Sequence, residues 1–298
     1  MSKFRAFNPY KYTVSARREI EIQPRITVVL NVFKRAKNLE RQLTAVRGQS
    51  IKPFEILIWE NGIETTPNAL REDVIIARAT ENLGVWARFA FALNARGDFI
   101  CMLDDDTIPG SRWLENCYKT MLIKPGLLGT RGIVFENSLS YSIHRDVGVY
   151  VPNEEIEEVD VVGHSWFFRK EWLGYYWSEL DNKFGEDVAG EDIHFSYILQ
   201  KHLNLPTLVP PHPVNDLSLW GSNPVLAIQL GAGVESISQS KDSLMRFECA
   251  LQHYRKLGFQ TMSEKSGTKS HYPKFAYFLV QKFPSLMHQI VRFKSKFQ

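Results

Sequence analysis

The first third of the chain alternates between short apolar runs and segments with apolar residues at helical spacing. Strand-length apolar runs cover residues 25–33, 54–59, 74–77 and 99–103. Between the first two runs, Leu39, Leu43 and Val46 recur at the spacing of one helix face. The alanine-rich residues 86–95 have helical character ahead of the fourth run. Strands that alternate with helices through short loops predict a parallel sheet covered by helices.

The second half of the chain is less regular. Strands are expected at residues 127–135, 147–151 and 159–162, and helices at residues 193–202 and 241–257. The expected fold class is α/β, a mostly parallel sheet covered by helices with a smaller mixed sheet in the second half. The expected divisions are a basic extension (1–24), one domain (25–262) with halves 25–108 and 109–262, and a linker with a basic tail (263–298).

Polar residues follow three of the expected strands. They are residues 31–35, Glu60 with Asn61, and residues 104–106. In an open α/β sheet, ligands bind at the carboxyl ends of the strands. Three polar clusters on one edge therefore predict a ligand-binding site there.

The last of these clusters consists of three consecutive aspartates, Asp104, Asp105 and Asp106. Carboxylates crowded where a buried strand emerges repel one another and lose solvation, so a cation is expected to hold them. Oxygen ligands favour Mg²⁺ or Mn²⁺, ions that commonly bind substrate phosphates as well. The alternative is a solvated acidic turn ahead of a helix that follows Pro109.

Composition and charge narrow the class of protein. The chain has 298 residues, 44% hydrophobic and 23% charged, with a net charge of +3, which is ordinary for a globular protein. Basic residues concentrate in both terminal segments and leave the body net negative, which argues against nucleic-acid binding. The three cysteines lack metal-binding spacing, and no secretory signal or membrane-spanning run is visible, so we expect a cytoplasmic protein.

Several sequence blocks share their order and spacing with a known family. They are residues 27–35 (TVVLNVFKR), 55–62 (EILIWENG), 82–88 (NLGVWAR), 95–106 (ARGDFICMLDDD), 162–169 (VGHSWFFR) and 190–192 (GED). They resemble, in turn, the Pro-Thr-Tyr-Asn-Arg strand, the Asp-Asp-Gly strand, the Asn-x-Gly segment, the Asp-x-Asp block, the acceptor-side strand and the Glu-Asp pair of family 2 glycosyltransferases. This resemblance implies the GT-A fold, which is Rossmann-like.

The chain departs from the family 2 pattern at two places. Asn31 and Val32 replace the Pro-Thr pair, and Glu60 replaces the aspartate that ends the second strand. Residues 103–107 and 213–215 also resemble the exostosin-like transferases of family 64, another GT-A group. Either resemblance implies metal-dependent transfer of a hexose or pentose from a nucleotide-sugar donor, by default a UDP-sugar, to a hydroxyl of a glycan or glycoconjugate acceptor.

The resemblance implies roles for the charged residues of the donor site. Asp106 is expected to be the principal ligand of Mn²⁺ or Mg²⁺. Asp104 is expected to be a second metal residue and to contact the ribose or donor sugar, with Asp105 either a helper in donor binding or a solvated side chain. Arg35 and Arg88 carry forked guanidinium groups suited to diphosphate or sugar oxygens. The alternatives are a structural ion pair for Arg88 and a solvated surface position for Arg35.

The remaining predicted donor residues lie at the ends of the first two strands. By resemblance, Glu60 and Asn61 are expected to hydrogen-bond the base, and a carboxylate there favours uracil. Asn31 and Phe33 complete the predicted donor-binding set.

An acidic pair downstream is the predicted catalytic centre. An inverting transferase needs a carboxylate to take the proton of the acceptor hydroxyl. The resemblance assigns that role to Asp192, with Glu191 orienting or assisting. The alternatives are that both residues only complement a helix dipole, or that transfer is retaining and Asp192 positions the acceptor.

Four aromatic or imidazole side chains complete the predicted site. His164 and Trp166 lie where acceptor-side residues are expected, and a tryptophan face suits sugar packing, although Trp166 equally suits a core position. Trp220 is expected in a loop over the donor. His212, in a proline-rich loop, is a candidate third metal ligand, with an ordinary surface position as the alternative.

The basic tail and two other functions remain open from sequence. Residues 271–298 interleave apolar and basic side chains, a pattern suited either to peripheral membrane contact or to a helix packed on the body. A nucleotidyltransferase would place aspartates similarly, but it needs a glycine-rich loop, and residues 33–38 contain no glycine. A non-catalytic protein of the same fold that binds a sugar nucleotide or glycan is the third possibility.

Overall fold

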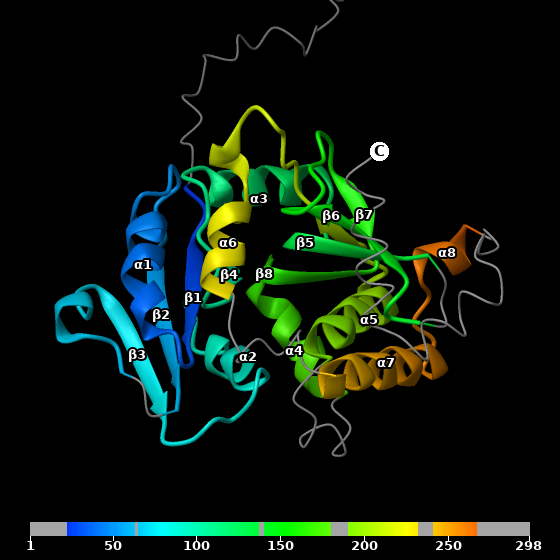
Figure 1. Ribbon diagram of the computed structural model, residues 1–298, viewed down its shortest axis with the longest axis horizontal. Coiled ribbons are helices and arrows are strands. Elements are labelled where there is room, and N and C mark those ends of the chain that lie inside the picture. Colours follow the sequence, from blue (N-terminus) through cyan, green and yellow to red (C-terminus); the bar gives the residue numbers. More distant parts are fainter. Residues whose placement is uncertain (1–22, 63–64, 137–139, 180–189, 232–240, 267–298) are drawn as a thin grey trace, which may run out of the picture.

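The computed structural model describes residues 23–62, 65–136, 140–179, 190–231 and 241–266. Nine strands of this described part form one sheet in the order β3-β2-β1-β4-β8-β5-β9-β7, with β6 paired to β5 (Figure 1). The strands are β1 Ile26–Val32, β2 Glu55–Asn61, β3 Val74–Ala79, β4 Phe99–Leu103, β5 Leu127–Phe135, β6 His144–Gly148, β7 Glu157–Val159, β8 Val161–Arg169 and β9 Thr207–Val209.

The strands of the first third form the parallel half of the sheet. β1 lies between β2 and β4 and runs parallel to both, with Val28 level with Ile56 on one side and Cys101 on the other. Strands buried on both faces read as continuous apolar runs, and β1 and β4 have this character. Their carboxyl ends therefore meet at one edge of the sheet, as the sequence predicted.

The second half of the chain extends the same sheet in mixed orientation. β8 pairs antiparallel with β4, with Trp166 level with Met102, and β5 pairs antiparallel with β8 and with β6. β9 runs parallel to β5. The predicted α/β class is confirmed, and the mixed strands join the parallel ones in a single sheet.

Helices pack on the sheet and on one another. They are α1 Leu39–Arg47, α2 Ala87–Ala92, α3 Trp113–Ile123, α4 Leu173–Ser178, α5 Glu191–Leu203, α6 Pro224–Gly231, α7 Lys241–Lys256 and α8 Met262–Lys265. α5 packs on β8, and α7 packs on α5 (Figure 1). A separate apolar cluster joins Ile133 and Val161 of the sheet to Ile198 of α5 and Leu251 of α7.

An aromatic cluster joins α2 to elements from the second half of the chain. Phe89 of α2 stacks on Tyr176 of α4 with ring centroids 4.8 Å apart, and Phe195 of α5 meets Phe168 of β8 edge-on at the same separation. Aromatic contacts of this kind add to the stabilisation from burial. The cluster fixes the beginning of α2 against the beginning of α5, where the predicted charged residues lie.

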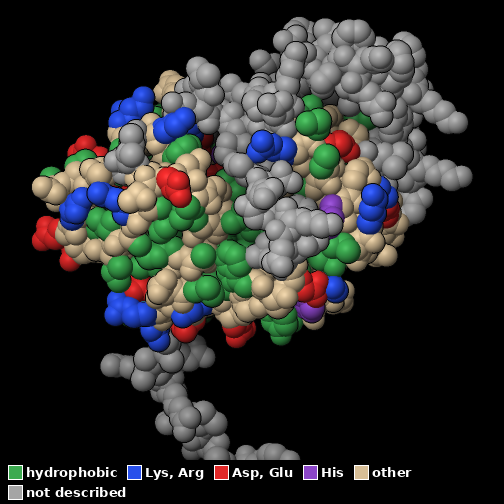
Figure 2. All heavy atoms as spheres, turned by 90° about the horizontal axis from the view of Figure 1, so that it is seen from below, with side chains coloured by type: hydrophobic (Ala, Val, Ile, Leu, Met, Phe, Trp, Pro, Cys, Tyr) green, Lys and Arg blue, Asp and Glu red, His purple; other side chains and the backbone are tan. Residues whose placement is uncertain are grey.

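Two of the predicted segments lie at the ends of the chain. Most of the predicted basic extension and the whole of residues 271–298 lie outside the described residues, and so does the membrane-contact prediction. Among the described residues, no helix is both long and apolar enough to cross a bilayer. Figure 2 views the molecule from below relative to Figure 1, and there hydrophobic side chains gather between charged ones.

Candidate active site

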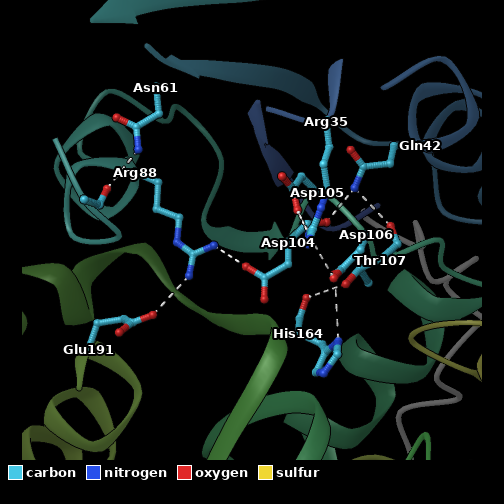
Figure 3. A network of polar contacts seen from close by, with 11 residues as sticks. Arg35, Gln42, Asn61, Arg88, Asp104, Asp105, Asp106, Thr107, His164 and Glu191 are labelled. Atoms are coloured by element: carbon cyan, nitrogen blue, oxygen red, sulfur yellow. Dashed lines mark hydrogen bonds and ion pairs between the residues drawn. The ribbon is translucent and has the colours of Figure 1, made fainter. Parts of the chain in front are cut away.

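The three aspartates form a tight turn directly after β4 (Figure 3). The N–H of Asp104 donates to the carbonyl of His164 at 3.0 Å, which attaches the turn to β8. The Gln42 amide of α1 donates to the carbonyls of Asp104 and Thr107 at 2.6 and 3.0 Å, and Asn38 donates to the carbonyl of Asp105. The backbone of the turn is therefore held independently of its carboxylates.

Arg35 lies over two of the carboxylates. Its Nη1 is 2.8 Å from Oδ1 of Asp105 and 3.2 Å from Oδ2 of Asp106, and all three side chains are about one-seventh exposed. Burial raises the pKa of Asp105 to about 7, against the opposing charge of Arg35. Burial and the charge of Asp104 likewise raise the pKa of Asp106. The positive charge of Arg35 therefore does not fully balance the negative charge of the carboxylates in the turn.

His164 completes this side of the site. Its Nδ1 lies 4.0 Å from Oδ1 of Asp106, is buried, and has no hydrogen-bond partner among the described residues. Burial lowers the pKa of His164, which favours the neutral ring. His164 was predicted to contact the acceptor, but the structure places it beside the predicted metal ligand.

Arg88 connects the aspartate turn to the predicted catalytic pair. It is the second residue of α2, and its side chain is 5% exposed. It donates through Nη1 to Asp104 and lies 3.2 Å through Nη2 from Oε1 of Glu191. Its guanidinium carbon is 4.5 Å from the ring centroid of Trp166, a cation–π arrangement. The structure thus contains the alternative that the sequence left open, an ion pair of Arg88 with an aspartate, and the donor contact of Arg88 stays a prediction.

Glu191 and Asp192 begin α5 and are both buried. They follow Gly190, whose φ of +106° is left-handed and whose Cβ, if present, would lie 2.8 Å from the Cβ of Ala250. Burial raises the pKa of Asp192 to about 6, opposed by the N–H of Ile193 and then by Arg88. Burial and Asp192 raise the pKa of Glu191 to about 8. Burial therefore favours the protonated form of both carboxyls.

The polar groups of the predicted base-binding residues form hydrogen bonds to other residues of the protein. The Glu60 carboxylate is 1% exposed and accepts from the N–H of Thr66 and from Arg78. Burial opposes ionisation, but these bonds outweigh it and hold the pKa of Glu60 below its usual value. Asn61 bonds Asn82 and the backbone of residues 83 and 84. The prediction of direct base contacts does not agree with these partners.

The ends of β1 and β2 meet near the site. Asn31 is partly buried and level with Trp59 of β2. Phe33 lies beside the turn at Gly62, where a Cβ would approach its ring to 4.0 Å. Both remain close to the carboxyl ends of the parallel strands, and their donor-binding role stays a prediction.

Three other predicted residues have core positions. His212 is fully buried between the rings of Trp113 and Trp220, with Nδ1 2.8 Å from the carbonyl of Pro210 and Nε2 accepting from Gly221. Both nitrogens are thus engaged, so this arrangement leaves neither for a metal ion. Trp166 is 2% exposed, which agrees with the alternative core position and not with sugar packing. Trp220, expected in a loop over the donor, is 4% exposed and packs against His212.

Several residues around the site carried no recognisable motif. Gln42 lies on the buried face of α1 with Leu39, Leu43 and Val46. A polar residue at an apolar helical position could therefore have identified Gln42 from the sequence. Arg131 of β5 pairs with Asp146 of β6 at 2.6 Å, a cross-strand contact that spacing does not reveal.

The donor set of the aspartate turn suits a divalent ion. Asp104 and Asp106 supply oxygens, and the unpartnered Nδ1 of His164 supplies a neutral nitrogen. Within the described part of the chain, however, no three such side chains are already arranged as ligands. The chemistry of the group fits Mn²⁺ or Mg²⁺, while Arg35 holds the carboxylates in the present arrangement.

Comparison with known proteins gives the family. The profile described as glycosyl transferase family 2 matches residues 27–202, more than half of the chain. No curated protein matches. Among solved structures, TarS from S. aureus is 14% identical with a TM-score of 0.45, and the match covers 63% of this chain and 35% of TarS.

Two further structures are similar at the same level. The mannosyltransferase PcManGT from Pyrobaculum calidifontis, solved with GDP-Man and Mn²⁺, is 15% identical with a TM-score of 0.42, covering 89% of this chain and 82% of its own. S. aureus TarS 1–349 with UDP is 13% identical with a TM-score of 0.44, covering 80% and 73%. By the profile match, which confirms the family 2 resemblance, the chain belongs to glycosyl transferase family 2.

Proposed function

We propose that the protein transfers a sugar from a nucleotide diphosphate to a hydroxyl of a glycan or glycoconjugate. The observation that carries this proposal is the bridge made by Arg88. One guanidinium joins Asp104, at the predicted donor end, to Glu191, at the predicted acceptor end. Family membership supplies the reaction class, and the bridge supports a single site in which both ends operate together.

At the donor end, Asp104 and Asp106 would hold a divalent ion, with His164 as the neighbouring nitrogen donor. The ion supplies positive charge for the departing diphosphate. The residues themselves set the position of that charge, because Gln42 and Asn38 fix the backbone of the turn. Asp105 faces Arg35, which supports a role in holding that guanidinium.

At the acceptor end, Asp192 is the proposed base. A general base works best when its pKa lies near the operating pH, and burial raises the pKa of Asp192 to about 6. Glu191 is held by Arg88, which supports an orienting role. Under a retaining mechanism Asp192 would instead position the acceptor hydroxyl.

The donor base is the least constrained part of the proposal. A uridine donor follows from the family 2 resemblance at Glu60, but that carboxylate is already bonded to Thr66 and Arg78. We therefore propose UDP-sugars as the first group to test and GDP-sugars as the second.

A thermal-shift panel tests the proposal. A ligand that binds only the folded protein raises its melting temperature, so a nucleotide sugar is expected to stabilise the wild type with Mn²⁺ and much less without it. The Asp106→Asn variant should lose the Mn²⁺-dependent part of the shift. If the full panel of nucleotide sugars leaves the wild type unshifted, the donor proposal fails.

A further inference from the structure

We propose that Arg35 is an internal counter-cation of the aspartate turn, which opposes binding of a divalent ion until a nucleotide diphosphate offers the guanidinium another partner. The inference rests on the proposed function in one respect, the assignment of Asp106 as the metal ligand. It adds that metal and nucleotide bind cooperatively and that Arg35 is the residue that couples them.

The geometry gives Arg35 the position of a cation. Its Nη1 contacts one oxygen of Asp105 and one of Asp106, at 2.8 and 3.2 Å. The other oxygen of Asp106 faces His164. A metal ion on that side would share the Asp106 carboxylate with Arg35. Two positive charges on one poorly solvated carboxylate repel each other, so each weakens the binding of the other.

The backbone of the loop and of the turn is held by bonds that do not involve the Arg35 side chain. The N–H of Asn38 donates to the carbonyl of Arg35, and the Asn38 side chain donates to the carbonyl of Asp105, so loop and turn are tied together. Gln42 holds the other end of the turn. Neither set of bonds uses the Arg35 side chain, so a change of its partner need not disturb the ligands.

A diphosphate is a suitable new partner for the displaced group. A guanidinium binds phosphate oxygens through a fork of parallel hydrogen bonds, which are stronger than bonds between neutral groups. Arg35 follows β1 at the carboxyl edge of the sheet, where the nucleotide of an α/β protein binds. A purely structural ion pair would instead leave metal affinity uncoupled from nucleotide.

Titration calorimetry with Mn²⁺ alone is the first test. Arg35→Gln is expected to bind Mn²⁺ about tenfold tighter than the wild type, the size of effect of one charge-assisted hydrogen bond on a ligand carboxylate. Lys37→Gln removes the same charge from an exposed position in the same loop and should stay within about threefold of the wild type. Arg35→Lys, which keeps the charge, should also stay close.

Two results would overturn the counter-cation role. One is Mn²⁺ affinity in Arg35→Gln that does not exceed the wild-type value, and the other is an equal gain in Lys37→Gln. The double variant Arg35→Gln with Asp106→Asn should lose the tight binding, which ties the effect to this turn. Arg35→Ala serves for the same comparison if the glutamine variant folds poorly.

Nucleotide binding is the second test. With saturating UDP, and separately with GDP, the Mn²⁺ affinity of the wild type should rise by a larger factor than that of Arg35→Gln. If the Mn²⁺ affinity rises by an equal factor in both proteins, Arg35 does not exchange its carboxylate partners for the diphosphate. If the wild-type protein binds neither nucleotide in the presence of Mn²⁺, the proposed function is contradicted. The comparison with Mn²⁺ alone still decides the counter-cation role.

Discussion

Arg88 has the most demanding environment of the charged residues in the site. Its guanidinium is nearly buried, stacks on Trp166 and bonds carboxylates from two different elements. Replacement by glutamine would leave Asp104 and Glu191 without their shared cation. Losing one partner of a buried ion pair costs about 3–5 kcal/mol. We expect Arg88→Gln to lower the free energy of unfolding by that amount, measured by urea denaturation.

An exposed ion pair provides the control for this prediction. Arg145 lies 3.2 Å from Glu157, and both side chains are more than one-third exposed. Exposed pairs contribute about 0–1 kcal/mol, so Arg145→Gln should change stability within that range. A loss in Arg88→Gln no larger than in Arg145→Gln would contradict the bridging role.

Asp192 should give the transfer reaction its lower pH limit. The proposed base is active only when it is ionised, and burial raises its pKa to about 6. Activity is therefore expected to fall as the pH drops through about 6. Asp192→Asn should bind nucleotide as the wild type does and lose turnover by about 10²–10⁴-fold, the usual contribution of general base catalysis. Calorimetry of the donor and initial rates separate these effects, and retained turnover would refute the role.

At the scale of elements, Gly190 determines where α5 begins. Its left-handed backbone and the nearby Cβ of Ala250 exclude a side chain there. We expect Gly190→Ala to destabilise the fold by about 1–3 kcal/mol, the usual cost of a strained backbone position. Displacement of Glu191 and Asp192 should also reduce transfer.

Gly174 is the matched control for this substitution. It lies in the first turn of α4, and a Cβ added there would have no atom within 4 Å apart from the helix's own backbone. Alanine is favoured over glycine by up to about 0.5–1 kcal/mol within a helix, so Gly174→Ala should be neutral or stabilising. Chemical denaturation measures the free energy of unfolding of both variants. Equal changes relative to the wild type would contradict the steric argument at Gly190.

Local pattern was sufficient for the elements that bear the site. The apolar runs of β1, β2 and β4 set a parallel sheet, and its geometry brings Arg35 and the aspartates to one edge. The local pattern does not predict which side chains far apart in the sequence form pairs. Whether Glu60 faces a base or Arg78 depends on tertiary packing, and so does the enclosure of His212 between two tryptophans.

At the scale of the molecule, the site lies where the parallel strands of the sheet meet the antiparallel ones. β4, the last strand of the parallel half, supplies the aspartate turn, and its antiparallel neighbour β8 supplies His164. α5 packs on β8 and brings in Glu191 and Asp192. Arg88 then joins the two halves. Loss of the packing between α5 and the sheet should therefore affect catalysis before it affects the parallel half.

The buried acids of this junction should reduce stability at high pH. An acid whose pKa is higher in the folded than in the unfolded state stabilises the fold at low pH, and that contribution is lost as the pH rises through the folded value. For Asp192 the window runs from about 3.9, the unfolded value, to about 6.

Asp192→Asn removes this titration and keeps a side-chain oxygen to accept from Ile193. Its stability relative to the wild type should therefore rise between pH 4 and pH 8 by on the order of 1–3 kcal/mol. Urea denaturation of both proteins across that range measures the difference. A constant difference would mean that Asp192 ionises as easily in the folded protein as in the unfolded chain. A widening difference would show that the proposed base is kept at the expense of stability.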